Sequence, residues 1–144
     1  MKGNLDENAK IVQMLDPASY AAAAEAFTAG VDCAGYDELL IMLSMGTATA
    51  TGDVTFQVEE SDSLSTGYVD VTGALLGVGT TPAEVTVSND NTVYLLRLDL
   101  GKRKRFIRVG YDVDDDNVIF GILGVLSRPQ VAPVTQVNAV VASV

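Results

Sequence analysis

The sequence predicts an all-β protein: an antiparallel β-sandwich, jelly-roll-like or immunoglobulin-like, with extended amino- and carboxyl-terminal arms. From Tyr36 onward, short apolar runs alternate with clusters of Gly, Asn, Asp, Ser and Thr, the pattern of sandwiches and barrels. Residues 54–59 alternate apolar and polar side chains with the period of a strand. The 144 residues, 48% hydrophobic and 19% charged, suffice for one core. We expect a sandwich domain over residues 21–127, between arms at 1–20 and 128–144.

The individual strands follow from these apolar runs. Strands are expected at residues 36–45, 54–59, 68–71, 84–87, 92–98, 105–111 and 118–126. In the second strand Val54, Phe56 and Val58 should face the core. Turn-forming residues predict a hairpin with a long tip between the second and third strands, and another hairpin between the last two.

Small residues and prolines govern the remaining segments. Gly121 and Gly124 predict a bulge or the close approach of another backbone. Residues 16–35 fit two structures: a helix capped by Asp16, or two edge strands at 21–27 and 31–33 that pair around Ala29 and Gly30. The strands are slightly favoured. The two arms lack core periodicity, so we expect a neighbouring chain to order them.

Composition excludes several kinds of chemistry. The chain has no histidine and one cysteine, so histidine-dependent triads and structural zinc sites cannot form. Cys33 is expected to be a buried small hydrophobe. Asp112, Asp114 and Asp116 alternate like calcium ligands, but Asn117 and Leu123 stand where an EF-hand needs Gly and Glu. The segment is therefore expected to be a solvated hairpin tip, and we predict no cofactor, no metal and no catalytic residues.

Charge is strongly segregated along the chain. The formal net charge is −10, which disfavours binding to nucleic acid or anionic lipid, and neither partner is expected. No apolar run is long enough to span a bilayer. Six of the nine Lys and Arg residues nevertheless lie between Arg97 and Arg108. A solvated turn and a contact with acidic residues of the same or a neighbouring subunit are both consistent with this run.

Two segments are therefore candidate interfaces. The strand at residues 36–45 is apolar on both faces in its middle, as expected if its outer face meets another subunit. The candidate interface residues are Lys102, Arg103, Lys104, Arg105, Arg108, Tyr36, Leu40 and Met42.

The order of motifs resembles a family of small structural proteins encoded in the head-gene modules of tailed phages. The resemblance spans about residues 35–133. It rests mainly on the hairpin motif Glu59-Glu60-Ser61-Asp62 and the strand motif Lys104-Arg105-Phe106-Ile107-Arg108-Val109. These motifs are structural, and the family has no catalytic residues to carry over. The resemblance implies a β-sandwich virion component, often a capsid decoration protein.

The function predicted from the sequence is that of a non-enzymatic capsid decoration (cement) protein. Its expected partners are the major capsid protein and further copies of itself, with a trimer favoured. It should be made in the host cytoplasm and reside on the capsid surface of the virion. Alternatives are another virion component, such as a head-spike base, connector or tail protein, and a carbohydrate- or calcium-dependent binding module.

Overall fold

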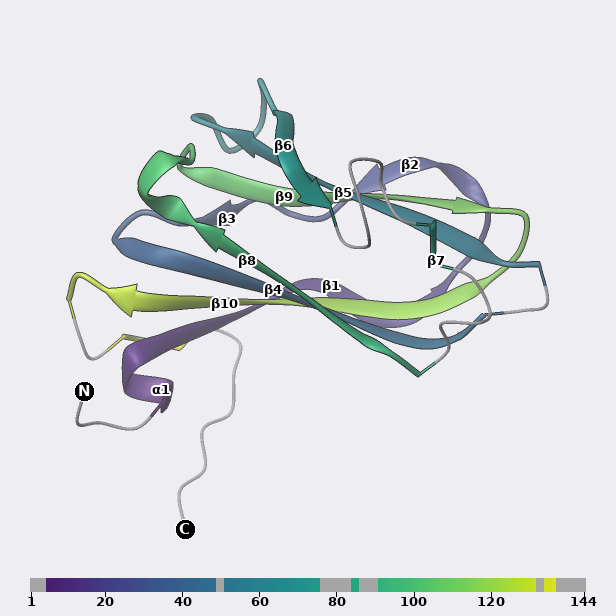
Figure 1. The fold of residues 1–144 in the computed structure, drawn as a ribbon, viewed down its shortest axis with the longest axis horizontal. Helices are drawn as coiled ribbons and strands as arrows, with labels where there is room; N and C mark the ends of the chain where they lie inside the picture. The colour runs from purple at the N-terminus through teal and green to yellow at the C-terminus, as the bar shows by residue number, and fades with distance from the viewer. Residues whose placement is uncertain (1–4, 49–50, 76–83, 86–90, 132–133, 137–144) are drawn as a thin grey trace, which may run out of the picture.

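The computed structural model describes residues 5–48, 51–75, 84–85, 91–131 and 134–136. Its strands stack as two antiparallel sheets (Figure 1). The first sheet has the order β1 (Ala9–Tyr20), β10 (Val118–Pro129), β4 (Tyr36–Ala48) and β8 (Val93–Asp99). The second has the order β2 (Ala23–Phe27), β9 (Phe106–Asp114), β5 (Asp53–Ser61) and β6 (Val69–Leu75). The predicted sandwich is confirmed.

Short elements complete the two layers. β3 (Val31–Asp32) pairs with β9, and β7 (Glu84–Val85) pairs with β5. A short helix, α1 (Leu5–Asn8), precedes β1, and a 3₁₀ turn, η2 (Leu100–Lys102), links β8 to β9. Within the described residues, no helix is both long and apolar enough to cross a membrane.

The core forms where the inner faces of the two sheets meet. Alternate residues of β4 and β10 are fully buried from one layer, and alternate residues of β5 and β9 from the other, as the two-residue period of a strand requires. Val54, Phe56 and Val58 face the core as predicted. Phe56 meets Phe120 of the opposite sheet edge to face, with ring centroids 5.2 Å apart. The sheets therefore interdigitate through their largest side chains.

The strand predictions hold, but the second predicted hairpin is wrong. β5 and β6 form the expected antiparallel hairpin. β9 and β10 do not pair with each other, because β9 lies in the second sheet and β10 in the first. The turn between them has Asp115 at a φ of 60° and carries the chain across the sandwich. Residues 86 and 87, predicted as strand, lie outside the described residues.

Residues 23–27 and 31–32 are strands, which decides the open alternative at 16–35 against a helix. The predicted pairing of these two strands with each other is wrong, because both pair with β9 in succession. Thr28 lies between them and is buried. Its backbone N–H donates to the Val109 carbonyl, and its hydroxyl accepts from the Val109 N–H. The backbone groups of β9 thus stay satisfied where β2 ends.

The amino-terminal segment packs more closely than an arm would. Residues 9–20 form an edge strand against β10, and Ala9 and Met14 are buried. The sequence concealed this strand because its register shifts twice, between Gln13 and Leu15 and between Leu15 and Ala18. Each shift interrupts the two-residue alternation that would have indicated a strand.

The carboxyl-terminal segment contacts the free edge of β1. The backbone N–H of Val134 donates to the carbonyl of Glu7. The Gln136 side chain accepts from the Ile11 N–H and donates to the Ala9 carbonyl. A side-chain amide thus replaces a neighbouring strand at this part of the edge.

Gly121 permits the close approach of another backbone, as predicted, whereas Gly124 is approached by side chains alone. A Cβ atom at Gly121 would lie 2.9 Å from the Pro17 Cα, because the shifted part of β1 crosses directly over β10. A Cβ atom at Gly124 would lie 3.2 Å from the Met14 sulfur, at the end of a flexible side chain. Only the first contact is with backbone, so Gly121 tolerates substitution less well.

We expect Gly121→Ala to lower the free energy of unfolding by about 2 kcal/mol, since the Pro17 backbone must move to admit a methyl group. Gly124→Ala, on the same strand, should cost less than half as much because the Met14 side chain can adjust. Urea unfolding of both variants measures the difference. Equal losses would show that the close approach of Pro17 does not limit this position.

Candidate functional site

The outer surface of the first sheet is mostly apolar, although Ser44, which pairs with Val93, and Arg97, which pairs with Leu40, also lie on it. Directly paired residues of antiparallel strands point to the same side of a sheet. Leu123 pairs with Met42, and Met42 with Leu95, in a row across three strands. The apolar face, as we define it, consists of Ile11, Leu40, Met42, Val93, Leu95, Ile119, Leu123 and Val125. Leu95 is 61% exposed and Val93 56%. Contiguous exposed apolar surface of this kind is typical of protein interaction sites.

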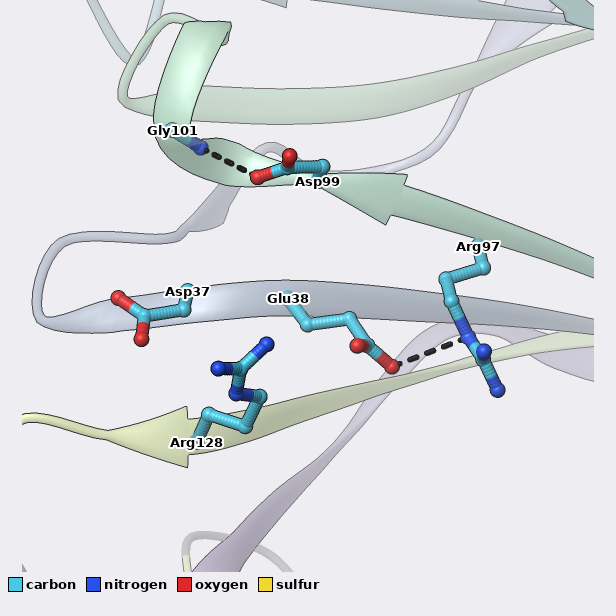
Figure 2. A pocket seen from close by; sticks show the side chains of 6 residues that line it. All are labelled: Asp37, Glu38, Arg97, Asp99, Gly101 and Arg128. Carbon is cyan, nitrogen blue, oxygen red and sulfur yellow. Dashed lines mark hydrogen bonds and ion pairs between the residues drawn. The ribbon is translucent and has the colours of Figure 1, made fainter.

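Charged residues of both signs close one end of the apolar face. Beyond Leu40, the next row across the sheet contains Glu38 paired with Asp99. These residues help line an open depression of about 480 Å³, together with Asp37, Arg97, Gly101 and Arg128 (Figure 2). The Arg97 Nε lies 3.1 Å from a Glu38 carboxylate oxygen. An apolar centre with a charged margin matches the usual anatomy of a protein interface.

The outer surface of the second sheet is acidic. Asp53 pairs with Asp114, and Glu59 with both Arg108 and Asp70. The acidic face, as we define it, comprises Glu25, Asp53, Asp70, Asp112 and Asp114. Glu59 lies among them but is buried and paired with Arg108. The two exterior surfaces of the sandwich therefore differ: one is mostly apolar and the other carries clustered negative charge.

The neighbouring carboxylates of the acidic face affect the pKa of Glu25. Partial burial raises the pKa of Glu25, and the negative charges of Glu59, Asp112 and Asp70 raise that pKa further. The Glu25 carboxylate accepts a hydrogen bond from the Gln57 side chain. Glu25 therefore reports the repulsion among the acids of this face.

The cationic run is largely paired within the chain. Arg105 donates two hydrogen bonds, of 2.9 and 2.8 Å, to the Asp32 carboxylate of β3. These bonds hold the pKa of Asp32 below its ordinary value. Arg103 lies 3.6 Å from Glu60, and the Lys104 backbone N–H donates to the same carboxylate. The run fastens the start of β9 to neighbouring strands, while Lys102 is exposed; docking to a neighbouring chain through this run stays a prediction.

Arg108 is held more tightly than the rest of the run. Its Nε lies 2.5 Å from a Glu59 carboxylate oxygen, and the Glu59 side chain is only 10% exposed. Its guanidinium lies 3.8 Å from the ring centroid of Phe27 and 4.0 Å from that of Tyr68. Arg108 thus links β2, β5 and the segment before β6 through one ion pair and two cation–π contacts.

The apolar interface candidates from the sequence divide into two groups. Leu40 and Met42 are half-buried members of the apolar face, with Leu39, Ile41 and Leu43 buried behind them. Tyr36 packs against the core at the start of β4, and burial raises its pKa. The contributions of β1, β8 and β10 to the apolar face were missed. The run Val93-Tyr94-Leu95-Leu96 was the available signal, because it too is apolar on both sides.

Two other sequence features are structural in this protein. Cys33 is buried as predicted, and burial, aided by Asp32, raises the pKa of its thiol to about 12, so it stays protonated at neutral pH. Asp112 and Asp114 end strand β9, and Asp115 and Asp116 form the turn to β10, where the Asp116 N–H donates to the Asp114 carbonyl. Within the described part of the chain, no three Cys, Asp or Glu side chains are grouped to hold a metal ion.

Comparison with known proteins gives similarity of fold. No protein family matches the chain, and no curated protein matches it. The crystal structure of the PBSX exported protein XepA matches with 16% identity and a TM-score of 0.56. That match covers 99% of this chain and 45% of XepA, so the chain spans less than half the length of XepA.

Two further solved structures match less well. The SPBc2 prophage-derived protein YomS has 12% identity and a TM-score of 0.39, over 81% of this chain and 97% of YomS. A protein of the disulfide-linked pili of Bacillus endospore appendages has 14% identity and a TM-score of 0.36, over 88% of this chain and 96% of that one. None of these three structures is described as that of a capsid decoration protein.

We expect Arg108→Met to lower the free energy of unfolding by about 3 kcal/mol, because the buried Glu59 carboxylate loses its counter-charge. The matched variant Arg97→Met removes an Arg whose side chain is 72% exposed and should cost less than about 1 kcal/mol. Urea unfolding measures both. Similar losses in the two variants would contradict a special role for Arg108.

Glu25→Gln should stabilise the protein at neutral pH and flatten its pH dependence. Because folding raises the pKa of Glu25, the folded state holds that proton more tightly, and wild-type stability falls as pH rises through the folded-state pKa. The gain should vanish on acidification below the unfolded-state pKa. Urea midpoints from about pH 4 to about pH 7 measure it, with Asp37→Asn on the other sheet as the control for net charge. A Glu25→Gln curve parallel to wild type would refute this coupling.

Proposed function

We propose that this protein is a non-enzymatic structural component of a phage or prophage-derived particle, and specifically a decoration protein of the capsid. The observation that carries the proposal is the contrast between the apolar face and the acidic face. A protein with one apolar and one charged exterior has a defined orientation: the apolar face contacts other subunits and the acidic face remains in water. Such a protein acts by binding and needs no reacting group.

The fold and the interior support this role. The XepA match assigns the chain the same fold as a PBSX exported protein. The arginines of the cationic run hold strands together within the chain, which favours a rigid module. A rigid module that occurs in many copies gains stability for a whole shell from one small interface repeated many times.

The proposal is tested on particles. We expect quantitative mass spectrometry of purified particles from the source strain to find this protein at a copy number comparable with that of the major capsid protein. Deleting its gene should leave assembled particles that open at a lower temperature. Adding the purified wild-type protein should restore the lost thermal stability, because a ligand that binds only the intact shell stabilises it.

Other outcomes assign other roles. A few copies per particle would place the protein at a vertex, neck or tail and refute decoration. Complete absence from particles, with the protein recovered elsewhere in the culture, would refute the structural role in the virion altogether.

A further inference from the structure

The apolar face is the size of a small sheet-to-sheet contact. It draws on all four strands, spaced about 4.8 Å apart, and is longest on β10, where it runs from Ile119 to Val125, so it fits within roughly 19 by 24 Å. Pro17 of β1 lies over β10 at Gly121, between the two ends of this row. The apolar face is formed by strand residues held in antiparallel register, so its backbone is already in place before any partner binds. Sheets with such faces pack about 10 Å apart.

We propose that the partner covering the apolar face is a second copy of this chain, packed face to face about a two-fold axis. The inference rests on the proposed function only in taking this face as a protein contact. In a two-fold pair the same surface is used twice, so that surface must complement itself. The apolar rows satisfy this requirement, because Leu, Ile, Val and Met side chains pack against their own kind without direction or charge.

The charged margin also complements itself. It holds two arginines, Arg97 and Arg128, and three carboxylates, those of Asp37, Glu38 and Asp99. Within the described residues Arg97 bonds Glu38, whereas Arg128 has no ion pair although it faces the same depression (Figure 2). When the charged ends of two copies meet, Arg128 of each finds carboxylates of the other.

The distribution of the remaining charge removes the main objection to self-association. Each copy has a formal net charge of −10, which by itself would drive two copies apart. The acidic face lies on the sheet opposite the apolar face. Face-to-face pairing therefore places the two acidic faces on the outside, separated by all four sheets of the pair and screened by salt.

The area of the apolar face limits how tightly two copies can bind each other. Two such footprints bury roughly 900 Å² at most, which is below the standard size of a specific interface and typical of weak association, so we expect a dissociation constant on the order of tens of micromolar. Leu95 is the position to test, because it is the most exposed member of the apolar face. Leu64 is a matched control: it is 58% exposed and belongs to the turn between β5 and β6, in the other layer.

The first experiment places a reporter on the face. The chain has no tryptophan, so Leu95→Trp introduces a single fluorophore. We expect its emission to move to shorter wavelength as concentration rises from about 0.1 to about 100 μM, in step with pair formation seen by sedimentation velocity. Leu64→Trp should pair equally well without any change in emission.

The second experiment disrupts the face. Leu95→Lys should raise the dissociation constant about a hundredfold, because the substitution is present twice in a two-fold pair. Leu64→Lys should leave it unchanged within about twofold, and circular dichroism should show both variants folded. A wild-type protein that stays monomeric, Leu95→Trp pairs that form without an emission change, or pairs indifferent to Leu95→Lys would each overturn the inference.

These outcomes separate the two proposals. A monomer that nevertheless binds and stabilises particles would refute pairing and keep the proposed function. A two-fold pair of a protein that is missing from particles would keep pairing and refute the proposed function.

Discussion

The architecture depends on a single constraint: the central strands of the two sheets are consecutive in the chain. β9 is hydrogen-bonded to β2 and β3 on one side and to β5 on the other, and β10 lies between β1 and β4. The short turn after Asp114 joins them, so the two sheets must stack directly on each other. Phe120 in β10 then meets Phe56 of β5 and the ring of Tyr111 in β9. Stacking brings the inner faces of the two sheets together. The residues that alternate with the core residues along each strand form the outer faces.

Ion pairs between strands explain why an acidic protein contains a basic run. β9 enters the second sheet through Arg105 and Arg108, and each arginine meets a carboxylate contributed by a strand distant in sequence. Asp32 and Glu59 thereby become structural acids, whereas Glu25 and Asp112 remain on the acidic face with their charges opposed to one another. Positive charge is placed where strands must be held together. The surplus negative charge stays on the outside.

Local pattern predicted the strands but could not predict which strands pair. Residues 54–59 reveal their inner face because Val54, Phe56 and Val58 alternate with polar residues, and each side chain faces the core as the period requires. No comparable rule says that residues 106–114 and 118–129 belong to different sheets, since a short turn is equally compatible with a hairpin. β1 was missed because its register shifts twice. Arg105 could not be matched to Asp32 from sequence, because the two are 73 positions apart.

The apolar face, too, could be predicted only in part from the sequence. Leu40 and Met42 were found because β4 is apolar on both sides, but the apolar face exists only once β1, β10 and β8 lie beside β4 in register. A protein whose two outer faces were both apolar would stack without limit into filaments. Here the second outer face carries Glu25, Asp70 and Asp112 close enough to raise the pKa of the first, so a third copy approaching that face meets repulsion instead of burial. The contrast between the faces therefore favours association that stops at a closed pair, and it leaves the acidic exterior in water to keep such pairs apart.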